Sequence, residues 1–254
     1  MLTLLIFPGD ARNPTHSPFC LKAMCLLEMA GQDWQPEFVQ DFSTLPLGRV
    51  PVLRVGDRLI PDSAHIQEYL ESRGATFNAG LTKDQLAQSH ALIRMTEESL
   101  RLGLVHDRWL DPEAWPIMRA NFFATVPEVA REQVAGEVQA QVRAGLESNG
   151  IARFDPADRV RRLTRDIDAL ARALGQGPFL FGDAPTAADA AIAPVVDMIL
   201  QLPVETGLRA AMQAHRGFAP YIARVREAIY PPMERLNNAV MPTVPSDADA
   251  KLSA

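Results

Sequence analysis

The chain contains only two cysteines among its 254 residues, Cys20 and Cys25, and both fall on one predicted helix. Two thiols so close in sequence are poorly placed for a structural disulfide and too few for a metal cluster, so we expect no metal site and a reducing, cytoplasmic location. No apolar run approaches the ~20 residues of a membrane-spanning helix. A basic excess is also missing, and the net charge of −6 argues against a general binder of nucleic acid or anionic membranes.

Strand and helix signals alternate in the first 75 residues. We expect strands at 4–7, 37–41, 52–55 and 58–60, and helices at 17–30 and 62–73. The order is therefore β-α-β followed by β-β-α, with a proline opening the third strand. This is the thioredoxin-like plan, so residues 1–75 are predicted to form one α+β domain.

Everything after a linker at 75–82 carries helical signals, so residues 83–232 are predicted to form an all-α domain. Helices are expected at about 83–108, 113–148, 155–174, 186–200, 206–214 and 217–229. Thr186 and Asp189 form a capping box at the start of one of them, and we expect a structural role for this acid, worth about 0.5–2 kcal/mol. Residues 239–254 are small, polar and proline-bearing, so a disordered tail is expected there.

Two short motifs point to a site that holds a small peptide. Val50-Pro51 places a proline where a strand begins, which leaves main-chain groups of the preceding residue free to pair with something else. Asp62-Ser63 opens a helix, and the exposed N–H groups at such a helix start attract a carboxylate. The pair of motifs suits a ligand bound by its main chain and its acidic end.

Three motifs occur here in a characteristic order and spacing: the Val50-Pro51 step, the Asp62-Ser63 helix start, and Gly182-Asp183 ahead of the capping box in the second domain. With these motifs the chain resembles the glutathione S-transferase superfamily over about residues 1–230. The local sequence Ser17-Pro18-Phe19-Cys20 looks like the branch of metaxin-like and failed-axon-connections-like proteins. The resemblance implies a cis Val50–Pro51 bond, glutathione as co-substrate with no other cofactor, a small electrophile as second substrate, and a homodimer.

The resemblance also implies a role for each matching residue. Val50 pairs its main chain with the cysteinyl part of glutathione, next to Pro51. At the γ-glutamyl end, Ser63 donates to the carboxylate and Asp62 pairs with the amino group. The family's tyrosine near the end of the first strand is absent, because Phe7 stands there.

Thiol transfer needs a thiolate near neutral pH, and a hydroxyl at a helix N-terminus favours one. Ser17 fits this description, so its hydroxyl either donates to a glutathione sulfur or only caps the helix before Pro18. Thr15 or His16, in the loop 12–16, is an alternative donor. Cys20 is either a redox nucleophile or a packing residue on the inward face.

Three functions remain open on this evidence: a glutathione transferase, a thiol-disulfide oxidoreductase that uses Cys20, and a non-catalytic interaction module on the same scaffold. Several residues of the helical domain have two possible roles: they either line a pocket for the second substrate, or they belong to the hydrophobic core or to a solvated helix surface. They are Trp109, Trp115, Phe122, Phe123, His90, Arg94 and Arg101.

Overall fold

The computed structural model describes residues 1–39 and 41–237, and it divides the chain into two compact units. The first unit is Met1–Ala75 together with the chain from Pro231 onward, and the second is Thr76–Tyr230. The sequence placed the end of the second domain at 232, whereas the chain already rejoins the first unit at Pro231. The predicted tail, 239–254, lies outside the described residues.

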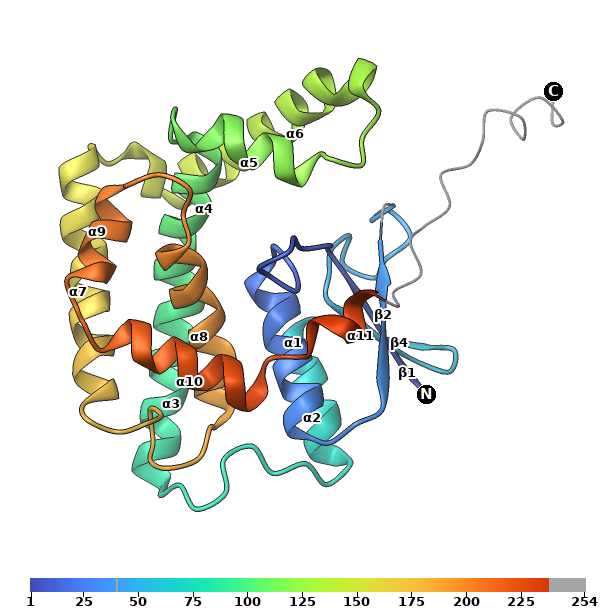
Figure 1. The fold of residues 1–254 in the computed structure, drawn as a ribbon, viewed down its shortest axis with the longest axis vertical. Helices are drawn as coiled ribbons and strands as arrows, with labels where there is room; N and C mark the ends of the chain where they lie inside the picture. The colour runs from blue at the N-terminus through green and yellow to red at the C-terminus, as the bar shows by residue number, and fades with distance from the viewer. Residues whose placement is uncertain (40, 238–254) are drawn as a thin grey trace, which may run out of the picture. The chain divides into compact units, whose positions relative to one another are not determined.

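A mixed sheet of four strands forms the centre of the first unit (Figure 1). The strands are β1 (Leu2–Ile6), β2 (Trp34–Phe38), β3 (Val52–Val55) and β4 (Arg58–Pro61), in the order β2-β1-β3-β4. β1 pairs with β2 in parallel, and the other two pairings are antiparallel. This arrangement confirms the predicted α+β, thioredoxin-like plan.

The second strand lies three residues earlier than predicted, at 34–38 instead of 37–41. Trp34 anchors it, because this side chain is only 2% exposed. Pro36 lies inside this strand. A proline is tolerated there because β2 is an edge strand of the sheet.

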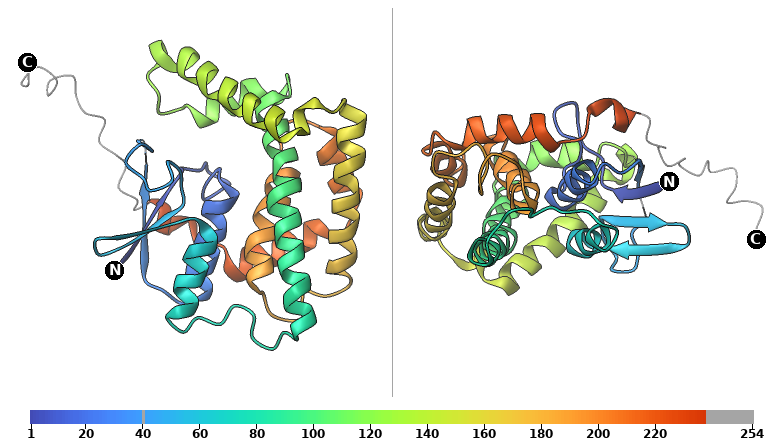
Figure 2. Two further views of the ribbon diagram at one scale, coloured as in Figure 1. Left: turned by 180° about the vertical axis from the view of Figure 1, so that it is seen from behind. Right: turned by 90° about the horizontal axis from the view of Figure 1, so that it is seen from below.

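Two helices, α1 (Pro18–Met29) and α2 (Ser63–Ser72), pack against one another beside this sheet (Figure 2). Ser17 is the N-cap of α1, where its side chain accepts a hydrogen bond from the Cys20 N–H, and Pro18 occupies the first helical position. Residues 20–27 of α1 are all buried. The predicted capping role of Ser17 is therefore confirmed.

A short C-terminal helix, α11 (Met233–Asn237), packs on the edge strand β2. The Arg235 Nη1 donates to the Trp34 carbonyl at 3.0 Å, and its guanidinium lies 5.2 Å from the centre of the indole ring. Glu28 accepts from the indole Nε1 at 2.9 Å and pairs with Arg235 Nε at 3.1 Å. These contacts cover an edge that would otherwise be open.

The described part of the second unit is helical throughout, which confirms the predicted all-α region. Its elements are α3 (Lys83–Met95), the π-helical turn η1 (Thr96–Leu100), α4 (Arg101–Leu110), α5 (Ala114–Phe122), α6 (Glu128–Asn149), the 3₁₀ turn η2 (Ile151–Arg153), α7 (Pro156–Leu174), α8 (Ala187–Leu200), α9 (Gly207–Gln213) and α10 (Phe218–Ile229). The helix expected at 113–148 is two helices, because Pro127 disfavours helical backbone at the residue before it. Among the described helices, none combines the length and apolar character needed to cross a bilayer.

Helix α8 is the buried centre of the second unit, with residues 187–199 all buried. Its first turn holds Asp189, which is fully buried and accepts four hydrogen bonds. The donors are the Thr186 N–H at 2.8 Å, the Thr186 hydroxyl at 2.9 Å, the Leu180 N–H at 3.0 Å and the Tyr221 hydroxyl at 3.0 Å. Asp189 therefore joins three segments of the fold in addition to capping one helix.

Candidate functional site

One end of the sheet gathers the motifs that the sequence singled out. The register aligns Leu5 of β1 with Val52 of β3, and Val52 with Pro61 of β4. The end of β1, the start of β3 and the end of β4 therefore meet at one end of the sheet. The loop after β1, the Val50–Pro51 step and the Asp62-Ser63 helix start all lie at this end.

The Val50–Pro51 bond is cis, as the resemblance implies. The Asp62 N–H donates to the Pro51 carbonyl at 3.1 Å, which extends the β3–β4 pairing by one residue. Among the residues that the structure describes, neither the N–H nor the C=O of Val50 has a hydrogen-bond partner. Because buried backbone groups are nearly always paired, the unpaired main chain of Val50 makes this position a candidate binding point for a short extended segment.

Asp62 precedes α2 in an unusual conformation, with φ 74° and ψ 138°. It is the one non-glycine residue of the described chain with positive φ, and such outliers concentrate at functional sites. Its Oδ1 accepts from the Ala64 N–H at 2.8 Å and so caps the helix. Asp62 is solvent-exposed, and Oδ2 remains available to a cation.

Ser63 begins α2 and is only 2% exposed. Within the described chain its hydroxyl has no hydrogen-bond partner, and its oxygen is not among the fully enclosed unpaired side-chain atoms of those residues. The first N–H groups of α2 also lack acceptors within the helix, and the helix dipole favours negative charge at this end. The start of α2 therefore offers a hydroxyl and backbone donors to a carboxylate.

The start of α1 supplies the second part of the site. The Ser17 Oγ accepts from the Cys20 N–H at 3.3 Å, and the Ser17 N–H donates to the Thr15 hydroxyl at 3.2 Å. The Cys20 sulfur is fully buried among the Ser17 and Thr15 hydroxyls and the Phe7 main chain. Burial raises the pKa of this thiol to about 11, against the opposing effect of these hydrogen bonds.

The loop before Ser17 is folded back on itself. Asp10 Oδ1 accepts from the Arg12 and Asn13 N–H groups at 2.8 and 2.9 Å, and the His16 N–H donates to the Pro8 carbonyl at 3.0 Å. A Cβ at Gly9 would lie 1.9 Å from the Asn13 carbonyl oxygen, so the turn requires glycine there. Thr15 is fully buried beneath this loop.

The structure thus brings Ser17, Val50, Pro51, Asp62 and Ser63 to one edge of the first unit. The sequence did not anticipate the buried contact of Thr15 with Cys20, or the stacking of Phe7 on Phe42 with ring centres 4.9 Å apart. The position of Thr15 two residues before the N-cap was the available signal for the first. Metal-ligand clusters of three or more His, Cys, Asp or Glu side chains are absent from residues 1–39 and 41–237.

The four aromatic residues flagged in the second unit pack on one another. Trp109 stacks on Trp115 with ring centres 5.2 Å apart, and Phe122 and Phe123 lie within 6.2 Å of Trp109. Together they join α4 to α5. Arg101 donates to the Glu97 carbonyl and Arg94 pairs with Glu98, so both arginines have partners on their own helix.

The chain matches two family models in succession. Residues 18–114 match the glutathione S-transferase N-terminal domain, and residues 127–232 match the glutathione S-transferase C-terminal domain. The chain belongs to the glutathione S-transferase superfamily.

Curated relatives include enzymes and metaxins. The isoprene-epoxide glutathione S-transferase of Rhodococcus sp. is 29% identical over 223 residues, which cover 84% of this chain and 93% of the relative. Human metaxin-2 is 22% identical over 148 residues, which cover 58% of this chain and 56% of metaxin-2. The second match agrees with the metaxin-like branch predicted from the Ser17-Pro18-Phe19-Cys20 sequence.

Solved structures of the superfamily share the fold. A beta-etherase from Sphingobium sp. aligns with a TM-score of 0.61 at 16% identity, over 89% of this chain and 94% of the other. A glutathione S-transferase III in apo form aligns with a TM-score of 0.58 at 17% identity, over 96% and 99%. These likenesses establish the architecture.

Proposed function

We propose that this chain binds glutathione at the end of the sheet, beside Val50 and Ser63, and conjugates its thiol to a small electrophile. The observation that carries the proposal is the combination of two groups without a hydrogen-bond partner among the described residues, the Val50 main chain and the Ser63 hydroxyl at a helix start. A short peptide with a free carboxylate satisfies both groups at once. Glutathione is then a co-substrate, and no further cofactor is required.

Val50, Ser63 and Asp62 each bind a different part of the glutathione molecule. Val50 pairs with the main chain of the cysteinyl residue, which then lies as a short extended segment beside the start of β3. Ser63 and the first N–H groups of α2 hold the γ-glutamyl carboxylate. The exposed Oδ2 of Asp62 pairs with the γ-glutamyl ammonium while Oδ1 keeps its cap on Ala64.

Ser17 is the proposed donor to the glutathione sulfur. A hydroxyl has one donor and two acceptor sites. In the structure, the Ser17 hydroxyl is hydrogen-bonded to the Cys20 sulfur, and its Oγ accepts from the Cys20 N–H. Because a charged acceptor makes the stronger hydrogen bond, we expect a guest thiolate to take the single Ser17 proton from the neutral Cys20 thiol and to be stabilised by it.

The same burial weighs against Cys20 as a redox nucleophile. With a pKa of about 11, only about one thiol in 10⁴ is a thiolate at pH 7. Its sulfur is also fully buried in the described structure. A reductase role for Cys20 therefore requires the start of α1 to open, which conjugation through Ser17 does not.

Small epoxides are the first electrophiles to test, because a relative at 29% identity is named for isoprene epoxide. A strained epoxide opens when a thiolate attacks carbon: the S–C bond forms, the C–O bond breaks, and the resulting alkoxide takes a proton from water. Family membership also supports a homodimer and a cytoplasmic location as parts of the proposal. Sedimentation velocity and cell fractionation would test these two points.

The decisive experiment compares Ser17→Ala with Ser17→Thr. Threonine keeps both the N-cap and the hydroxyl, whereas alanine loses both and is expected to cost about 1 kcal/mol of helix stability. We expect Ser17→Thr to retain conjugation and Ser17→Ala to lose about tenfold in kcat/KM at pH 7, with the pH profile of conjugation displaced upward.

Equal rates in the two variants would remove Ser17 from the mechanism. Failure of the wild-type chain to be retained on glutathione resin would favour a non-catalytic interaction module instead. Loss of mixed-disulfide reduction in Cys20→Ser, together with unchanged conjugation in Ser17→Ala, would favour the oxidoreductase alternative.

A further inference from the structure

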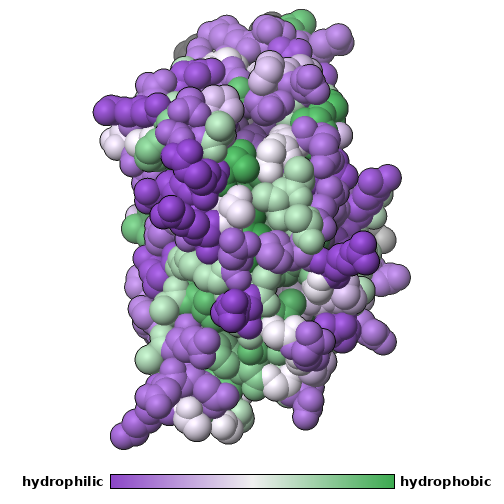
Figure 3. Space-filling model, turned by 90° about the vertical axis from the view of Figure 1, so that its left-hand side faces the viewer, coloured by the Kyte–Doolittle hydropathy of each residue, from purple (hydrophilic) through white to green (hydrophobic). Residues whose placement is uncertain are grey.

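The start of α7 concentrates positive charge in an otherwise acidic chain. Residues 153–165 carry five arginines against two aspartates, while the whole chain has a net charge of −6. The side of the molecule on which α7 lies in Figure 1 is largely hydrophilic, with apolar groups between the polar ones (Figure 3). This segment therefore presents a local charge opposite in sign to that of the chain.

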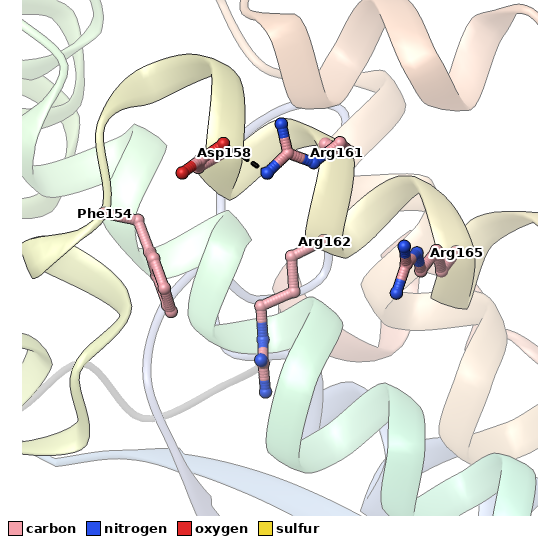
Figure 4. A pocket seen from close by; sticks show the side chains of 5 residues that line it. All are labelled: Phe154, Asp158, Arg161, Arg162 and Arg165. Carbon is pink, nitrogen blue, oxygen red and sulfur yellow. Dashed lines mark ion pairs between the residues drawn. The ribbon is translucent and has the colours of Figure 1, made fainter.

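The charged side chains surround a hollow of about 210 Å³ on the surface of the second unit. Five residues line it: Phe154, Asp158, Arg161, Arg162 and Arg165. Figure 4 shows the Phe154 ring and the Arg162 side chain extending in the same direction from the two sides of the hollow. The Arg162 Cζ lies 5.7 Å from the ring centre, and the ring is 40% exposed.

The carboxylates near the hollow already have hydrogen-bond or ion-pair partners within the chain. Asp158 pairs with Arg161 at 2.5 Å, and the Asp155 side chain caps α7 by accepting from the Asp158 N–H. Asp166 accepts from the Ser99 hydroxyl at 2.5 Å.

Two of the three guanidinium groups that line the hollow have no carboxylate partner among the described residues. They belong to Arg162 and Arg165, and both residues are exposed. The hollow therefore combines two unpaired guanidinium groups with an exposed aromatic ring.

We propose that this hollow is a docking site for an extended, acidic segment of a partner polypeptide. Two glutamate carboxylates of the segment pair with Arg162 and Arg165, and the aliphatic stem of the glutamate at Arg162 packs on the neighbouring Phe154 ring. Alternate side chains of an extended chain point the same way and lie about 6.6 Å apart, a spacing that two long arginine side chains one helical turn apart can meet.

The size and shape of the hollow favour a polypeptide over a free small molecule. Pockets that enclose small molecules hold about 300–1,000 Å³ and are mainly apolar, whereas this one is smaller and mostly charged. A single side chain of a larger partner fills such a hollow, and the rest of the partner supplies additional contacts. The site lies on α7 of the second unit and is independent of the proposed glutathione site.

The test measures fluorescence anisotropy of a labelled ten-residue peptide with glutamate at alternate positions. The full-length protein is titrated in low salt as wild type, as Arg162→Gln/Arg165→Gln, and as Phe154→Ala. A matched control, Arg143→Gln/Arg216→Gln, removes the same charge from two exposed arginines elsewhere in the second unit. Circular dichroism and retention on glutathione resin monitor the fold of each variant.

We expect the wild type and the control to bind within twofold of one another, and the paired substitution at Arg162 and Arg165 to weaken binding at least tenfold. Added salt should weaken wild-type binding, because these groups are solvent-exposed. Phe154→Ala should weaken binding severalfold.

Equal binding by the site variant and the control would overturn the proposal. Equal binding of a peptide with glutamine in place of glutamate would overturn it as well. Binding only to a serine-phosphorylated peptide would show that phosphate is the ligand and would also refute the acidic segment proposed here.

Discussion

Replacing Cys20 with alanine makes the stability of the protein less sensitive to alkaline pH. Burial raises the pKa of this thiol from 9.0 to about 11, while hydrogen bonds from Ser17, the Phe7 main chain and Thr15 act in the opposite direction. Two pKa units correspond to about 3 kcal/mol of preference for the neutral thiol in the folded state. Because the group is fully buried, solvent screening does not reduce this figure.

The sign follows from the proton counts. Below pH 9 the Cys20 thiol is protonated in both the folded and the unfolded chain, so its contribution to the free energy of unfolding is fully present. Between pH 9 and pH 11 the unfolded chain loses the proton while the folded chain keeps it, so stability falls as pH rises. At pH 10 about half of this free energy, on the order of 1 kcal/mol, has been lost.

The assay is urea denaturation of the wild type and Cys20→Ala at intervals from pH 7 to pH 10. Cys25 is present in both proteins, so its effect cancels in the difference. We expect the difference in free energy of unfolding between the two proteins to shrink by about 1 kcal/mol over this range. A gap that stays constant would show that the Cys20 thiol is not held neutral by burial, and it would revive the redox hypothesis for this residue.

Two further predictions concern the scaffold. Asp189→Ala should lower the free energy of unfolding by about 4 kcal/mol, measured by chemical denaturation, because the buried N–H groups of Leu180 and Thr186 lose their acceptor; a loss under 1 kcal/mol would contradict the four-bond network. Arg235→Ala should cost about 1 kcal/mol by removing the half-buried contacts of α11 with β2, whereas Arg73→Ala, at an exposed helix end, should be neutral. Equal effects of the two arginine substitutions would contradict a stabilising role for α11.

Local sequence patterns predicted most of the architecture, because capping residues, prolines and glycines mark the helix starts and the turns. The capping box of Thr186 and Asp189, the Ser17-Pro18 start of α1 and the hairpin around Gly56 all lie where the sequence indicated. The wrong start of β2 has a tertiary cause. Pro36 is acceptable only because the strand lies at the sheet edge, and that position depends on the whole sheet.

The details of the candidate site were harder to predict, because they depend on tertiary geometry. No residue pattern in the sequence indicates the positive φ of Asp62, or that the main chain of Val50 has no hydrogen-bond partner among the described residues. Cys20 could be assigned to an inward or a reactive role from its helix position, but only the fold shows its complete burial. The residue types in the sequence predicted the position of the candidate site. Its hydrogen bonding and the burial of Cys20 depend on how the loop after β1, the start of β3 and the start of α2 pack together.

The central claim is that the start of α2 holds a glutathione carboxylate, and titration calorimetry with reduced glutathione tests it most directly. The proteins to compare are the wild type, Ser63→Ala, and Ser72→Ala as a control at the opposite, exposed end of the same helix. We predict that the wild type and the control bind equally, and that Ser63→Ala loses about tenfold or more in affinity, the cost of one hydrogen bond to a charged group. Undiminished binding by Ser63→Ala, or no binding by the wild type, would contradict the account.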